Sequence, residues 1–383
     1  MSNIYAPYRE DAEEQHRYSV RHSYSATAFP PAGDPFELDV LDCSIDFNAS
    51  ERPYVRGSIT AKVIEDQDTL DSLDPRKAVR VHVFMGYIYD GFVKDVNLVA
   101  DLHIRTRTID RPSNTMTLVL GGDEELAEDY KRMAWGPHAP TTGINEFVQF
   151  HANKASVPGT ATVVSDFPAG YGATELAGMV QDVGQDSLSM LLDAAERLNV
   201  SVFCDGDRTW RIKKQSEIAG ATALKLYVGA GGTILNAQSS LTRGVGEGKG
   251  FCNAVALIYR WKDSGGVDHV IYGNATVSAG PFATTAVGAK TFSEERQFPI
   301  ASTALANQTA SNLLKILAGR GNQMTLEAHA AYWLRPGHTV TVQLPAGDQQ
   351  RFLVTQVQFN PTTGTMDLVL KQPINVTIST TSG

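Results

Sequence analysis

The chain has 383 residues, which is enough for two or three domains of ordinary size. Hydrophobic residues make up 42% and charged residues 20%, a balance typical of a folded globular chain. No run of about 18 apolar residues occurs, and the N-terminal segment has no apolar stretch after its charges, so we expect neither a membrane span nor a secretory signal.

The net charge of −9 is unevenly distributed. Residues 1–135 contain 24 acidic and 15 basic residues, whereas residues 136–383 contain 18 of each. The sequence has no run of Lys or Arg, so we do not expect a surface that binds nucleic acid by neutralising phosphates. The acidic excess belongs entirely to the first third of the chain.

Residues 1–34 are polar, rich in Tyr and Arg, and end in a proline-containing stretch. They offer little apolar surface to offset the entropy that is lost on ordering. We therefore expect an N-terminal arm that does not fold alone.

Residues 35–135 predict a β-rich domain, either a barrel or a sandwich. Apolar and polar residues alternate around Phe36–Val40 and Val79–Val83, which is the period of a half-buried strand. Residues 91–122 predict further strands joined by a turn at RPSN, residues 111–114. A short helix is expected over residues 123–134, with Asp123 as its N-cap.

Residues 136–223 predict a small α+β domain. Helices are expected over residues 144–155 and 186–200, the second with one apolar stripe and a cap at Asp186 or Ser187. Residues 201–214 predict a hairpin whose turn is Asp205-Gly206-Asp207.

Residues 224–374 predict a second β-rich domain, with one helix over residues 302–319. Strands are expected over residues 251–261 and 266–277, and these two are expected to pair. Four short alternating strands follow, separated by Gly- and Pro-containing turns. Residues 375–383 form a C-terminal tail, and the fold class is mainly β with an α+β insertion.

The motifs that carry chemistry are absent or lack their context. The odd number of dispersed cysteines, Cys43, Cys204 and Cys252, indicates buried thiols and excludes a disulfide framework or a cysteine zinc site. His82, His103 and His329 lie within strand patterns, so we interpret these three as structural, and His338 follows Pro336-Gly337 in a turn. We predict no catalytic, cofactor-binding or metal-binding residues, and no enzymatic activity.

Three glycine-containing segments invite a functional interpretation and do not support one. The sequence GGDEEL at 121–126 resembles a cyclase signature but precedes a predicted helix, not the second strand of a hairpin. The segment 244–251 lacks the Ser or Thr that a phosphate-binding loop needs after its Lys, and GAGG at 229–232 lacks a βαβ context. We interpret the last two as turns or mobile loops, which could contact neighbouring proteins or act as a gate.

Taken in order, three groups of segments resemble the tail hub family of bacteriophages. This family includes baseplate hubs, the tail-tip hubs of long flexible tails (minor tail proteins of siphophages) and the base of type VI secretion spikes. The groups are residues 51–64, 73–87 and 121–131; residues 186–214; and residues 251–261, 303–319, 333–344 and 351–373. The resemblance covers roughly residues 36–373.

The resemblance implies two tail-tube-like β-barrels, residues 35–135 and 224–374, on either side of the small α+β domain. It implies a homotrimer at the tail tip of the virion, assembled in the host cytoplasm, whose six barrels join the hexameric tail tube to a three-fold tip. The implied partners are a distal tail or tail tube ring and a central tip, spike or tape measure protein. Double-stranded DNA would pass through the channel without specific binding, and the acidic residues of the first barrel could give the channel a negative lining.

Two other functions remain open at this point. A host-receptor or carbohydrate-binding tail-tip protein would have an exposed aromatic cluster, whereas Trp135, Trp210, Trp261 and Trp333 are scattered along the chain. A tail-associated cell-wall hydrolase would need a catalytic site that the sequence does not display.

Overall fold

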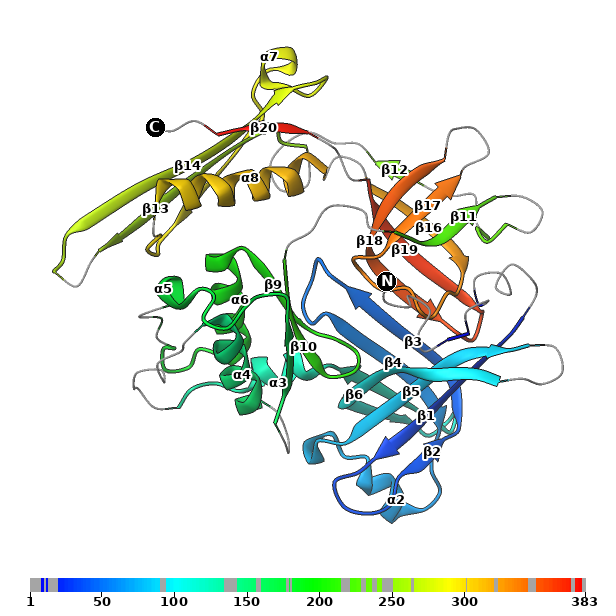
Figure 1. Cartoon of the computed structure of the whole chain (residues 1–383). Helices are drawn as coiled ribbons and strands as arrows, with labels where there is room; N and C mark the ends of the chain where they lie inside the picture. Colours follow the sequence, from blue (N-terminus) through cyan, green and yellow to red (C-terminus); the bar gives the residue numbers. More distant parts are fainter. Residues whose placement is uncertain are drawn as a thin grey trace.

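The computed structural model shows a mainly β protein (Figure 1). It describes residues 8–9, 12, 20–89, 94–133, 143–155, 160–176, 179, 181–214, 221–228, 232–235, 240–242, 251–262, 265–300, 302–319, 323–343, 349–372 and 376–380. Within this part of the chain, every helix is too short or too polar to cross a membrane.

Thirteen strands form one large sheet, and these strands come from both β-rich regions of the sequence. The strands of the first half are β1 (Arg21–Phe29), β2 (Phe36–Leu38), β3 (Val40–Asn48), β4 (Val55–Lys62), β5 (Arg80–Ile88), β6 (Lys94–Asp110) and β7 (Thr115–Gly121). Those of the second half are β11 (Thr222–Tyr227), β12 (Ser240–Thr242), β16 (Gln323–His329), β17 (Thr339–Gln343), β18 (Gln350–Asn360) and β19 (Thr365–Lys371). In the first half, the short helix α2 (Gln67–Ser72) and the turn η1 (Pro75–Lys77) connect β4 to β5.

The two halves are joined by strand pairing between β3 and β18. Residues Ile45–Asn48 lie antiparallel to residues Gln356–Phe359. Strand β17 pairs with the same edge of β18, but only as far as Leu353. A bulge at Thr355 separates the part of β18 that pairs with β17 from the part that pairs with β3. A single hydrophobic core lies under both halves, so they form one body.

Both halves have the same strand order. It is β1-β5-β6-β7-β4-β3 in the first half and β11-β17-β18-β19-β16-β12 in the second. Every neighbouring pair has the same direction in both halves except the outermost, where β1 is antiparallel to β5 and β11 is parallel to β17. The chain therefore contains an internal structural repeat.

The hairpins β6–β7 and β18–β19 show the repeat most clearly. Each contains a bulge, at Arg105 and at Thr355, and between the bulge and the turn each pairs residue for residue with the same offset. The turns end at Asn114 and Gly364, which both have positive φ, 52° and 70°. In both turns the N–H of this last residue donates a hydrogen bond to the carbonyl three positions earlier. The following strands, TMTLVL (115–120) and TMDLVL (365–370), share five of six residues.

The middle of the chain forms the predicted small α+β domain, which has its own hydrophobic core. Its elements are α3 (Asp123–Asp129), α4 (Ile144–Ala155), β8 (Thr162–Ser165), α5 (Ala173–Leu176), α6 (Ser187–Leu198), β9 (Val200–Cys204) and β10 (Thr209–Lys214). The predicted helix 144–155 is confirmed, and so are the Asp186 cap of α6 and the hairpin β9–β10. In Figure 1 this domain, drawn in green, lies beside the blue strands of the first half.

Residues 251–319 form a third unit between β12 and β16, with a core of their own. The unit consists of β13 (Ala254–Lys262), β14 (Asp268–Ala279), α7 (Thr284–Val287), β15 (Thr291–Arg296), α8 (Thr303–Gly319) and, from the C-terminal tail, β20 (Thr377–Ser379). The predicted pairing of residues 251–261 with 266–277 is confirmed as β13–β14, and α8 packs along this hairpin (Figure 1). Residues 224–374 therefore contribute to two sheets.

The structure differs from the sequence-based expectations in two places. Residues 21–29 of the expected arm form β1, because Ala26 and Ala28 enter the core while the backbone pairs with β2 and β5. The helix after residue 122 ends at Asp129, and its N-cap is Gly122, not Asp123.

Candidate assembly interface

Eight neighbouring strands of the sheet have one apolar and one polar surface. The strands are β12-β16-β19-β18-β3-β4-β7-β6, and we refer to them as the eight-strand strip. Because side chains alternate between the two faces of a strand, every second residue faces the core. The core-facing residues include Ile45, Phe47, Ile59, Leu118, Val357, Phe359, Leu368 and Leu326, all of which are buried.

The other surface of the strip is polar, and we refer to it as the polar face. Its residues are small or uncharged for the most part, and all but Asn48 are exposed or half-buried. They are Ser44, Asp46, Asn48, Arg56, Ser58, Thr60, Thr106, Thr108, Thr117, Val119, Thr325, Glu327, Gln356, Gln358, Asp367 and Val369.

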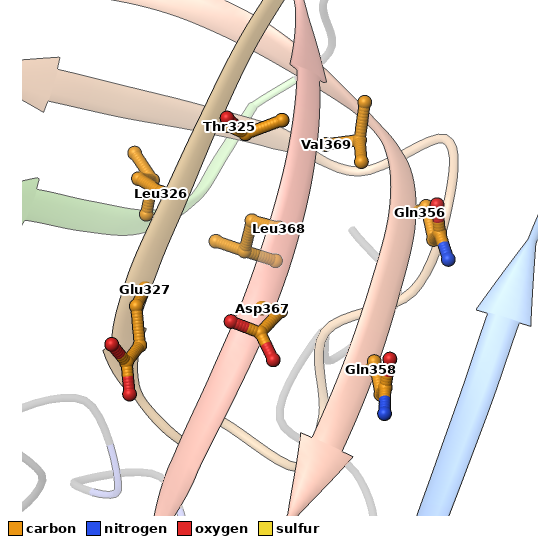
Figure 2. Close-up of a pocket in the computed structure, with 8 residues that line it drawn as sticks. All are labelled: Thr325, Leu326, Glu327, Gln356, Gln358, Asp367, Leu368 and Val369. Atoms are coloured by element: carbon orange, nitrogen blue, oxygen red, sulfur yellow. The ribbon is translucent and has the colours of Figure 1, made fainter. Parts of the chain in front are cut away.

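A shallow depression of about 260 Å³ lies on the part of this face that β16, β19 and β18 form. Figure 2 shows Glu327, Asp367 and Gln358 side by side across these three strands, with Thr325 and Gln356 further along. Such a hollow, open and lined mainly by polar side chains, lacks the enclosed apolar walls of a small-molecule site.

The junction between β3 and β18 is held on both faces. On the polar face, Gln356 Nε2 donates a hydrogen bond of 3.0 Å to Asp46 Oδ1. On the core face, the rings of Phe47 and Phe359 pack edge to face with centroids 6.2 Å apart. The guanidinium of Arg335 lies 4.3 Å from the Phe47 ring centroid, a cation–π contact.

The polar face is nearly balanced in charge within the first third of the chain. Asp46 is opposite Arg56 in the β3–β4 register, and the strand ends add Asp42 and Asp110 against Lys62. Burial raises the pKa of Asp46, while hydrogen bonding to Gln356 and the charge of Arg56 oppose the shift. The acidic excess of residues 1–135 therefore lies mostly outside this face, and the hypothesis of a negative channel lining stays a prediction.

Two carboxylates of the GGDEEL segment connect the sheet to the small domain. Asp123 accepts hydrogen bonds of 3.0 Å from His103 Nε2 and Arg208 Nε. Glu124 accepts from the backbone N–H groups of Tyr54 at 2.7 Å and of Cys204 at 2.9 Å. This segment is therefore structural, and its buried charges link β6 and the β4 entry to the hairpin β9–β10.

The two carboxylates respond differently to burial. Burial opposes ionisation of Asp123, but the hydrogen bonds from His103 and Arg208 outweigh it and keep the pKa of Asp123 below its ordinary value. Burial raises the pKa of Glu124, against the charge of Arg52 and the two backbone donors.

A second contact between the halves is aromatic. Tyr87 Oη donates a hydrogen bond of 2.6 Å to the Ala330 carbonyl and accepts one of 3.2 Å from the Tyr332 N–H. His22 Nδ1 lies 2.9 Å from Tyr332 Oη. These side chains come from β1 and β5 of the first half and from the segment before β17 of the second, so they hold the two halves together on the side of the core.

The residues singled out in the sequence have structural positions. All three cysteines are free and buried, as predicted. His82, His103 and His329 lie in β5, β6 and β16, and His338 precedes β17. Among the described residues, no group of His, Cys, Asp or Glu is arranged to hold a metal ion.

The tryptophans do not form an exposed aromatic cluster within the described chain. Trp210 and Trp333 are buried, and Trp261 is half-buried and stacked on His269 with ring centroids 5.1 Å apart. Trp135 lies outside the described residues, as do the glycine-containing segments 229–231 and 243–250. The loop and gate hypotheses for these segments stay predictions.

No family model matches the chain, and no curated protein matches its sequence. Solved structures of tail proteins do share its fold. The tail protein from Neisseria meningitidis MC58 is 14% identical over 91% of this chain and 97% of that chain, with a TM-score of 0.61. The 43 kDa tail protein of prophage MuSo2 from Shewanella oneidensis is 13% identical over 92% and 99% of the two chains, with a TM-score of 0.57.

A prophage tail protein from Listeria monocytogenes is 12% identical over 91% of this chain and 94% of that chain, with a TM-score of 0.53. The three matches extend over nearly the full length of both partners. At identities this low, the matches show a common fold and nothing finer. The resemblance found in the sequence is thus confirmed at the level of the tail protein fold.

Sequence reasoning missed the β3–β18 junction and the free ends of the eight-strand strip. Both follow from the internal repeat, whose signal in the sequence is the near identity of residues 115–120 and 365–370. Pairing between residues more than 300 positions apart has no local signature, so only the repeat could have indicated it.

Proposed function

We propose that this chain is a structural, non-enzymatic subunit of a bacteriophage tail tip, the hub. In this proposal three copies form a ring around an axial channel. The ring joins the six-fold tail tube on one side to a three-fold tip, spike or tape measure protein on the other. Double-stranded DNA passes through the channel during ejection.

The observation that carries the proposal is the internal repeat. Because each chain holds two β units with the same strand order, three chains present six similar units. A ring of this kind has true three-fold and approximate six-fold symmetry, and so it can contact a hexamer on one face and a trimer on the other. The tail protein fold of the three matched structures agrees with this role.

The dimensions of the strip suit a channel. Three copies of the eight-strand strip would give twenty-four strands, and at about 4.8 Å per strand the closed sheet would be at least about 37 Å across its backbone. Barrels of 16–18 strands already enclose water-filled channels. The apolar surface of the strip is covered by its own core, so the polar face is the surface that is free to line the channel.

The chemistry of the polar face suits passing DNA. On the polar face and at its strand ends, the cations include Arg56 and Lys62, and the anions include Asp42, Asp46, Asp110, Glu327 and Asp367. DNA affinity in proteins depends on several Lys or Arg side chains that displace counterions together. A surface of hydroxyl and amide groups with a slight negative charge does not retain the phosphate backbone.

The proposal is tested in the phage or prophage that encodes the chain. Deleting its gene is expected to produce filled heads without complete tails, and supplying the chain in trans is expected to restore infectivity. Immunogold labelling of complemented particles should place the chain at the distal end of the tail. Normal tails in the deletion strain, or label on the head, would rule the proposal out.

A further inference from the structure

We propose that the small α+β domain carries a saccharide-binding groove between α4 and the free edge of β8. The groove takes a short saccharide whose sugar units bear an acetamido group. It belongs to the small domain and not to the eight-strand strip, so the inference goes beyond the hub function and does not depend on the ring.

The groove is larger than the depression on the polar face, with a volume of about 600 Å³. This volume falls within the range of ligand sites in proteins. Glu146 is the one charged residue among those that line it, so an anionic ligand is disfavoured. The lining residues are Asn145, Glu146, Gln149, Phe150, Asn153, Val163, Ser165 and Phe167.

Two rows of α4 residues form one wall of the groove. Asn145, Gln149 and Asn153 recur every four positions, and Glu146 and Phe150 make the neighbouring row. The apolar residues of α4 enter the core of the small domain, so these rows belong to the outer side of the helix. The wall is therefore mainly amide, with one carboxylate and one aromatic ring.

The other wall is β8, the edge strand of the three-stranded sheet β8-β10-β9. The N–H of Asp166 donates to the Ile212 carbonyl of β10 at 2.9 Å. In the parallel register of these two strands, the backbone groups of even-numbered residues therefore point to β10. The backbone groups of the odd-numbered residues 161, 163, 165 and 167 point to the free edge.

Side chains of α4 satisfy this edge at both of its ends. At one end, the Ala161 N–H donates to Asn153 Oδ1 at 2.8 Å, and the Ala161 carbonyl accepts from Gln149 Nε2 at 2.7 Å. At the other end, the Phe167 carbonyl accepts from Asn145 Nδ2 at 3.3 Å. The amides of α4 thus take the place of a neighbouring strand at residues 161 and 167.

Between these two ends the edge is open at Val163 and Ser165, which both line the groove. Among the described strands only β10 pairs with β8, and it lies on the other side. The groove therefore presents an N–H donor and a carbonyl acceptor at each of two residues, roughly 7 Å apart along the strand. Backbone groups on such an edge bind a partner that supplies matching donors and acceptors.

The closed ends of the edge favour a short ligand over an extended peptide. A peptide strand added to β8 would run past residues 161 and 167, where the amides of Asn153, Gln149 and Asn145 already bond to the β8 backbone. A short saccharide stays between these ends. Its hydroxyl groups both donate and accept hydrogen bonds, so they match a groove that presents donors and acceptors side by side.

The backbone edge and the apolar lining together select an acetamido group. This group carries the N–H and C=O of a peptide, so it can bond to Val163 or Ser165 as a neighbouring strand would. Its methyl group would contact the half-buried side chains of Val163 and Phe150. The ring hydroxyls would bond to the exposed Glu146 carboxylate, since hydrogen bonds to a charged acceptor are the stronger ones.

The groove is held in shape before a ligand binds. Gln149 Nε2 also donates to Asn153 Oδ1 at 2.8 Å, so both amides have fixed orientations. The ring of Phe167 is stacked on that of Tyr171, with centroids 4.4 Å apart. A ligand therefore binds without having to order these side chains, which lowers the free-energy cost of binding.

Isothermal titration of the full-length chain with three probes tests the ligand class. The disaccharide of N-acetylglucosamine is expected to bind. Cellobiose has the same rings and linkage with hydroxyls in place of the acetamido groups, and it should bind at least about ten-fold more weakly. The tripeptide acetyl-Ala-Ala-Ala-amide represents the alternative occupant. Equal affinity for the two sugars, tighter binding of the tripeptide, or no binding of the disaccharide would overturn the proposal.

Three variants locate the site. Glu146→Ala removes the carboxylate from an exposed helix position and should weaken disaccharide binding at least about five-fold while the chain stays folded. Val163→Pro removes an N–H that points to the free edge, where an edge strand tolerates Pro, and should abolish binding. The matched control is Val164→Thr, because this side chain is 49% exposed and alternates to the other face of β8, so binding should be unchanged. Unchanged binding in Glu146→Ala would overturn the site even if Val163→Pro does not fold.

Co-sedimentation identifies which cell-surface material supplies the saccharide. The chain is expected to sediment with purified peptidoglycan if the cell wall is the source, or with lipopolysaccharide vesicles if the outer surface is. In either case Glu146→Ala should sediment at least about five-fold less than the unchanged chain. Equal sedimentation of the two would count against the groove and would leave the hub function untouched.

Discussion

Removing the hydroxyl of Tyr87 should weaken the connection between the two halves of the large sheet. This hydroxyl donates to the Ala330 carbonyl at 2.6 Å and accepts from the Tyr332 N–H at 3.2 Å, in a region where Tyr87 is 1% exposed. The substitution Tyr87→Phe keeps the ring and its packing, so it changes these hydrogen bonds with little change in volume.

The expected loss follows from the two backbone groups that lose their partner. An unsatisfied buried donor or acceptor costs about 1–3 kcal/mol, so a loss of about 2–4 kcal/mol in the free energy of unfolding is expected for the pair. Urea unfolding, followed by circular dichroism, measures this change. Amide hydrogen exchange should also become faster in β5 and in the segment 330–334, because the contact joins them.

The matched control is Tyr272→Phe, since the side chain of Tyr272 is 57% exposed. This substitution is expected to change the unfolding free energy by less than about 0.5 kcal/mol. The reasoning fails if both variants unfold at the same urea concentration, or if Tyr87→Phe accelerates exchange in only one of the two halves.

Three further predictions concern buried groups. Replacing Asp123 with Asn should lower the free energy of unfolding in urea by about 2–4 kcal/mol, because it leaves the Arg208 charge without its anion. A change below about 0.5 kcal/mol would contradict the role of this ion pair in joining the sheet to the small domain. Burial, and in second place the charges of His329 and Arg335, lower the pKa of His22 and His338 to about 4, so both are neutral when folded and bind protons from pH 6.5 downward when unfolded. The free energy of unfolding should therefore be highest above pH 6.5 and should fall towards pH 4 by up to about 1.4 kcal/mol per pH unit for each histidine. The slope should be shallower in His338→Asn. An unchanged slope would contradict a lowered pKa for His338. Truncating the fully buried Phe359 to Ala should cost about 3–5 kcal/mol by thermal or urea unfolding, and Phe359→Leu much less; equal stability of the two variants would show that the junction is loosely packed.

Local features of the fold could be predicted from the sequence because their causes are local. The helix 144–155 and the cap at Asp186 follow from apolar spacing and from a side chain that satisfies the first free N–H groups. The turn 111–114 follows from its residue types, and Asn114 adopts the left-handed conformation that they allow. These elements depend on neighbours within a few positions.

Tertiary pairing decided the features that sequence reasoning placed wrongly. The polar strand β1 has little apolar surface of its own, and it forms because β5 and β2 supply its hydrogen bonds. Asp123 is a reasonable cap in isolation, but His103 and Arg208, from β6 and the β9–β10 hairpin, draw its carboxylate away from the helix end.

The candidate interface depended on the longest-range contacts of all. Its polar face is visible in the alternation of each strand, but the order of the strands is not. The junction brings Asp46 to Gln356, 310 positions away, and only the repeated TM-x-LVL strand relates the two halves in the sequence. With the repeat recognised, the free edges β6 and β12 could be anticipated.

The most direct test of the central claim is a cryo-electron microscopy reconstruction of the tail tip in which the chain is resolved without imposed symmetry. The account predicts three copies around an axial opening, with the six β units at similar radius and the side chains of Asp46, Gln358 and Thr108 facing the opening. Six copies, or three copies with this face turned outward and the α8 unit lining the axis, would contradict it.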